Sequence, residues 1–79
     1  MQHDLTDQLR ALRADLQAAE EKASRARFDL TQRIQYARAG AKEMRPLKDF
    51  LEANDRANGA LHDARRALER FKRLHPETR

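Results

Sequence analysis

A chain of 79 residues with a net charge of +4 has room for at most one domain, and a chain this short buries only a small fraction of its surface. The absence of cysteine excludes disulfides and thiol chemistry. No apolar run approaches the length of a membrane span, and the first residues lack the regions of a signal peptide, so we expect a cytoplasmic protein without membrane contact. The joint abundance of alanine and arginine hints at a bacterial or phage source.

The first half of the chain carries an unbroken heptad pattern. Its apolar residues alternate spacings of four and three: Leu5, Leu9, Leu12, Leu16, Ala19, Ala23, Ala26 and Leu30. This spacing is typical of an α-helix that packs against another helix, and the segment contains no glycine or proline. Asp4 is expected to cap the helix, which is predicted to cover about residues 5–39.

The pattern changes after Leu30. A second step of four leads to Ile34, and this stutter shifts the apolar face of the helix. Gly40 lies between basic residues, which is the composition expected at a helix C-terminus, and Pro46 is tolerated only in the first turn of a helix. We therefore predict a turn at about 40–45.

The heptad pattern then resumes and continues to the end of the chain. Its members are Leu47, Phe50, Asn54, Ala57, Leu61, Ala64, Leu68, Phe71 and His75. Asn58-Gly59 is a turn signal inside this run, but the phase is the same on both sides of it. We predict one helix over about 46–74 and a tail at 75–79, with a break at Asn58-Gly59 as the alternative. Asn54 is expected to fix the register of the helix pair.

Two long helices joined by a short connection normally fold back as an antiparallel hairpin. By charge count, segments 1–21 and 49–64 each carry −3, whereas 22–48 carries +6 and 65–79 carries +4. When the chain folds back, the negative segment 49–64 lies along the positive part of the first helix, and the positive segment 65–79 lies along the negative segment 1–21. The sequence thus predicts a single all-α domain, a coiled-coil-like antiparallel helical hairpin. Because one face of each helix would stay wet, we expect a homodimer that forms a four-helix bundle.

Two aromatic residues lie off the main seam of the first helix. Phe28 and Tyr36 are eight residues apart, which places them near the same side of the helix. Exposed aromatic residues paired in this way indicate a contact surface for a second copy or another protein. The alternative is that the stutter rotates the core face onto them.

The densest basic patch lies near the C-terminus, where Arg66, Arg70 and Arg73 share a helical face. Guanidinium groups pair bidentately with oxyanions, so the patch suits phosphate or an acidic protein surface. The alternative is a solvated face that pairs with acidic residues of the hairpin or of a second subunit. No helix-turn-helix, zinc module or basic-zipper order is present, so nucleic-acid binding would be independent of sequence.

No catalytic, cofactor or metal site is expected. The chain has no cysteine, one serine and dispersed histidines, and it has no phosphate-binding glycine loop. We expect a non-enzymatic interaction module, an adaptor, chaperone or inhibitor, that binds a protein partner. The predicted binding residues are Phe28, Tyr36, Arg66, Arg70 and Arg73. The alternative is sequence-independent nucleic-acid binding through the C-terminal arginine cluster.

Overall fold

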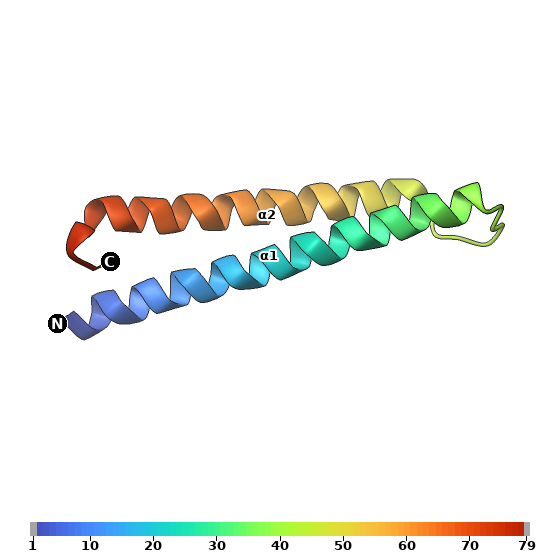
Figure 1. Cartoon of the computed structure of the whole chain (residues 1–79). Coiled ribbons are helices and arrows are strands. Elements are labelled where there is room, and N and C mark those ends of the chain that lie inside the picture. The colour runs from blue at the N-terminus through green and yellow to red at the C-terminus, as the bar shows by residue number, and fades with distance from the viewer. Residues whose placement is uncertain (1, 79) are drawn as a thin grey trace.

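The computed structural model describes residues 2–78 and consists of two long helices in this range. Helix α1 spans Gln2–Arg38 and helix α2 spans Leu47–Leu74, followed by a short 3-10 helix, η1, at Pro76–Thr78. The helices lie antiparallel and side by side, with both ends of the chain at the same end of the molecule (Figure 1). The predicted all-α helical hairpin is confirmed.

The helix limits differ from the predicted ones by a few residues. Helix α1 begins before residue 5, so Asp4 lies inside its first turn, where a carboxylate still complements the helix dipole. Pro46 is the N-cap of α2. Helix α2 continues through Asn58 and Gly59 without interruption, so the alternative of a break there is wrong. Arg79, which the predicted tail includes, lies outside the described residues.

A Schellman motif ends α1. Gly40 has a φ of 86°, a left-handed conformation that glycine adopts without a steric penalty. The N–H of Ala41 donates a hydrogen bond to the carbonyl of Tyr36 (3.0 Å), and the N–H of Gly40 donates to the carbonyl of Ala37 (3.1 Å). These two bonds satisfy carbonyls that the helix end would otherwise leave open, so the turn begins at the glycine that the sequence indicated.

The heptad seam of α1 is the face that α2 covers. Between Asp4 and Leu30, every residue that is buried or half-buried belongs to the seam, and every other residue is exposed. The deepest layer is near the chain ends, where Leu9 packs with Leu68 and Phe71. Three further leucines of α1 pack against this cluster: Leu5, Leu12 and Leu16.

The hairpin is long and thin. Its extents are 59 × 15 × 14 Å and its radius of gyration is 17.6 Å, whereas a compact domain of this length would have a radius of about 12 Å. The accessible surface is 6597 Å², compared with about 4,900 Å² expected for a compact protein of this mass. Most of each helix is therefore in contact with solvent. No helix within residues 2–78 is long and apolar enough to cross a membrane.

The opposite charges of the two helices are adjacent but unpaired. Among residues 4–77, whose side chains the structure describes, no ion pair joins α1 to α2. Lys48 and Glu52, one turn apart on α2, approach to 3.8 Å on the exposed surface. The charge blocks therefore favour the antiparallel arrangement through their general field and leave their individual side chains available for other contacts.

Candidate functional site

The turn end of the hairpin leaves large apolar side chains uncovered. Five such exposed residues fall between residues 28 and 51: Phe28, Ile34, Tyr36, Leu47 and Leu51. Leu74, at the other end of α2, is also exposed. The turn end therefore presents several large apolar side chains to solvent.

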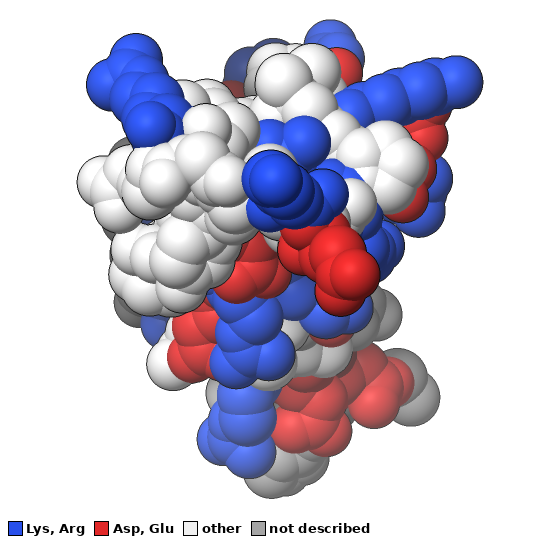
Figure 2. Space-filling view, turned by 90° about the vertical axis from the view of Figure 1, so that its right-hand side faces the viewer, with Lys and Arg blue, Asp and Glu red and all other residues white. Residues whose placement is uncertain are grey.

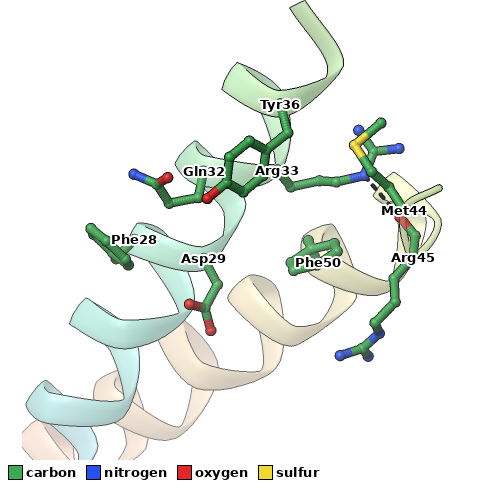
Figure 3. Close-up of a pocket in the computed structure, with 8 residues that line it drawn as sticks. All are labelled: Phe28, Asp29, Gln32, Arg33, Tyr36, Met44, Arg45 and Phe50. Carbon is green, nitrogen blue, oxygen red and sulfur yellow. Dashed lines mark hydrogen bonds between the residues drawn. The ribbon is translucent and has the colours of Figure 1, made fainter. Parts of the chain in front are cut away.

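Phe28 and Tyr36, which are 61% and 56% exposed, line an open hollow of about 460 Å³ at this end. Phe50 from α2 and Met44 from the turn complete its apolar lining. Figure 3 shows Phe28 and Tyr36 on one side of the hollow and Phe50 and Met44 on the other. We call this site the turn-end groove; its remaining lining residues are Asp29, Gln32, Arg33 and Arg45.

The stutter in α1 explains why the groove is open. Ile34, which continues the heptad spacing, is 37% exposed, whereas its neighbours Gln32 and Arg33 are half-buried. Polar side chains thus take the position that faces the turn and α2. Within the chain, the shifted face does not cover Phe28 or Tyr36, contrary to the alternative considered from the sequence.

Two arginine contacts hold the groove together. The Nε of Arg33 donates a hydrogen bond to the backbone carbonyl of Arg45 over 2.8 Å, which ties the turn to α1 (Figure 3). The guanidinium carbon of Arg45 lies 5.3 Å from the centre of the Phe50 ring, within cation–π range. These contacts fix the turn against both helices, so the groove is formed before any partner arrives.

The lining of the groove carries a small positive charge, from Arg33 and Arg45 against Asp29. The segment 22–50 around it carries eight bases and three acids, a net charge of +5. In the view onto the turn end, a broad area of uncharged side chains has Lys and Arg above and beside it, with Asp and Glu along its lower edge (Figure 2). An apolar hollow with net positive surroundings suits a segment that has apolar anchors and acidic flanks.

The predicted arginine residues form a separate group. Arg66, Arg70 and Arg73 are all exposed, and together with Glu69 they line a small hollow of about 110 Å³ on α2. None of the three makes an ion pair within the described chain. Along α2, Arg70 lies roughly 30 Å from Phe50. The structure therefore places the aromatic and the arginine residues at opposite ends of the hairpin.

No protein-family model, curated protein or solved structure matches this chain. Functional inference therefore depends on the residues and their geometry. Within the described residues, no group of three or more His, Asp or Glu side chains could hold a metal ion.

Sequence reasoning missed three contributors to the groove. Phe50 was predicted as a member of the seam, and Met44 and Arg45 fall within the predicted turn, so none of the three was predicted to line a binding site. Pro46 was the available signal: as the N-cap of α2, it sends the preceding residues back along α1 instead of outward into solvent.

Proposed function

We propose that this chain is a non-enzymatic protein-interaction module, an adaptor, chaperone or inhibitor, that binds a protein partner through the turn-end groove. The observation that supports this function most strongly is the pair of exposed aromatic side chains, Phe28 and Tyr36, in a preformed apolar hollow. Aromatic rings that stay exposed to water do not stabilise the free chain. Burial of the same rings against a partner would stabilise the complex.

The groove defines the kind of partner segment. Its apolar lining accepts one or two large apolar side chains, and the net positive charge around it attracts acidic residues beside them. An amphipathic helix with acidic flanks has both features in the spacing of its turns. We propose such a segment as the ligand.

We also propose that the hairpin works as a homodimer in which two hairpins form a four-helix assembly. The excess of accessible surface over that of a compact protein supports this state. A chain this short builds only a small core alone, and oligomerisation is one way in which such chains gain stability.

The aromatic pair is tested by charge substitution. Phe28→Asp and Tyr36→Asp should each weaken capture of the partner at least about tenfold, because a carboxylate in the hollow loses the apolar contact and repels acidic flanks. Partners retained by the immobilised wild-type chain would be identified by mass spectrometry, and one purified partner would then be titrated against each variant by calorimetry.

Leu51→Asp is the matched control, because Leu51 is an exposed apolar residue near the same end that does not line the groove. It should bind like the wild type, and circular dichroism should show equal helicity in all variants. Unchanged affinity in both Phe28→Asp and Tyr36→Asp would exclude the groove as the binding site.

The second candidate is nucleic-acid binding through Arg66, Arg70 and Arg73, supported by their exposure on one face without intrachain ion pairs. Titration of a labelled duplex over a range of salt concentrations separates the two functions. Phosphate contacts predict a steep loss of affinity with added salt, and no sensitivity to the groove variants. No binding at about 50 mM salt would exclude this candidate.

A further inference from the structure

One outer face of α2 carries charges of alternating sign at a spacing of seven residues. We call these residues the charge ladder: Asp49, Arg56, Asp63 and Arg70. Seven residues are about two helical turns, or roughly 10.5 Å, so the four side chains lie along one side of the helix and are too far apart to pair with each other. None of them makes an ion pair elsewhere in the described chain.

The face beside the ladder is hollow. Alanines at the same spacing, Ala53, Ala60 and Ala67, lie next to the charges and leave little side-chain volume above the backbone. One hollow of about 260 Å³ is lined by Asp49 and Ala53, and another of about 310 Å³ is lined by Asp63, Ala67 and Arg70. A second helix could therefore approach α2 closely on this side.

We propose that this face of α2 packs against the same face of a second copy of the chain, antiparallel, with the twofold axis beside Ala60. In this register Asp49 lies opposite Arg70 of the second copy, and Arg56 lies opposite Asp63 of the second copy. Twofold symmetry repeats each pair, so all four ladder positions meet a charge of opposite sign. A parallel arrangement would set every charge against itself. The inference rests on the proposed homodimer and specifies its interface.

Helix α1 adds two charges of fitting sign to the same side, although Arg25, which lines the same hollow, comes near the basic Arg65 and Arg66 of the second copy. Lys22 and Asp29 line the hollow that Asp49 and Ala53 also line, so they flank the proposed interface. Leu9 packs with Leu68 and Phe71, which fixes how α1 is aligned along α2. This alignment determines which residues of the second copy lie at the same height as Lys22 and Asp29. Lys22 comes to the level of Asp63 of the second copy, and Asp29 comes to the level of Arg70 of the second copy.

The area available fits a dimer. The accessible surface of 6597 Å² exceeds the compact expectation by about 1,700 Å², and a standard interface buries about 800 Å² on each partner. The antiparallel register also brings Leu74, which is 69% exposed, beside Pro46 of the second copy. The two turn-end grooves then lie at opposite ends of the assembly, and each adjoins the interface, because Asp29 lines the groove and also flanks the second copy.

Charge exchange tests the register directly. Arg56→Glu alone sets two glutamates against two Asp63 side chains in the homodimer, and Asp63→Arg alone sets arginine against arginine. Each single variant should dimerise at least about tenfold more weakly than the wild type at low salt. An equimolar mixture of the two variants should recover dimers, because each of its four ladder contacts again joins opposite charges. Arg56→Glu and Asp63→Arg combined in one chain should also recover the homodimer.

Sedimentation equilibrium at about 50 mM salt would measure these affinities, with Asp55→Arg as the matched control, since Asp55 is an exposed acid on another side of α2. Because the chain has no cysteine, Ala60→Cys provides a second measurement. It should form an intermolecular disulfide on mild oxidation, whereas Ala14→Cys on α1 should not.

The outcomes separate this interface from the proposed function. If Arg56→Glu and Asp63→Arg dimerise as strongly as the wild type, the ladder interface is wrong, while the proposed homodimer stands. A wild-type chain that remains a 9.2 kDa monomer at about 100 μM would overturn both the ladder and the dimer. Loss of partner capture on Phe28→Asp with normal dimerisation would support the groove and leave the ladder intact.

Discussion

Ala23 is the most deeply buried of the core residues, with 2% of its surface exposed, although it is one of the smallest side chains in the seam. Its burial means that the backbone of α1 lies close to α2 at this level, with no space for a larger group. We predict that Ala23→Leu lowers the free energy of unfolding by about 1–3 kcal/mol, because extra methylenes force the helices apart. Urea unfolding followed by circular dichroism would measure the change.

Ala18→Leu is the control for this substitution, because Ala18 is on the same helix and exposed. It should change the stability by no more than about 0.5 kcal/mol. If Ala23→Leu were as stable as the wild type, the helices would have room at this level, and the small seam residues would not determine their separation.

Single residues also show where sequence reasoning reached its limit. The seam of α1 was predicted residue by residue up to Leu30, because heptad spacing depends only on local helix geometry. Phe50 was assigned to the core, yet its ring also lines the groove under Arg45. That contact joins the turn to α2 and depends on how the connection folds back, which local spacing does not determine.

At the scale of elements, two glycines have opposite roles. Gly59 lies inside α2, and a Cβ at this position would have no atom within 4 Å. Gly40 ends α1 with a positive φ. We predict that Gly59→Ala raises the free energy of unfolding by about 0.5–1 kcal/mol, because alanine loses less backbone entropy in a helix. Gly40→Ala should lower it by about 1 kcal/mol, because a side chain is strained in the left-handed region.

Denaturant titration of both glycine variants would give these signs. A stabilising Gly40→Ala would mean that the Schellman motif does not end α1 in solution, and a destabilising Gly59→Ala would mean that α2 is distorted at its centre. The sequence predicted helices α1 and α2 and the turn between them, because Gly40 and Pro46 mark the end of one heptad pattern and the start of the next. It left a break as the alternative because Asn58-Gly59 is a turn signal by composition, and the continuous helix on both sides of it outweighs this local signal.

At the scale of the whole molecule, the hairpin has a long contact with few buried large side chains. Among the residues whose side chains the structure describes, the large buried hydrophobics are Leu9, Leu68 and Phe71, which lie together at one end. A single hydrophobic core of this size supplies only a few kcal/mol in a chain below about 80 residues. From the exposed helix faces we expected a second layer, which stays a prediction. Heptad spacing alone did not indicate the face of α2 that we now propose for it, because the ladder residues lie outside the seam.

If a second copy supplies that layer, the stability of the fold depends on protein concentration. Raising the chain concentration a hundredfold favours a folded dimer by about 2.7 kcal/mol, and for two chains of this length the melting temperature should rise by roughly 5–10 °C. Thermal unfolding at about 1 and 100 μM, followed by circular dichroism, would measure the shift. Arg56→Glu should melt lower than the wild type and show a smaller shift over the same range, because more of its chains unfold as monomers. A wild-type melting temperature that is independent of concentration would mean that one hairpin is sufficient for the fold, and the exposed surface of α2 would then have no stabilising role.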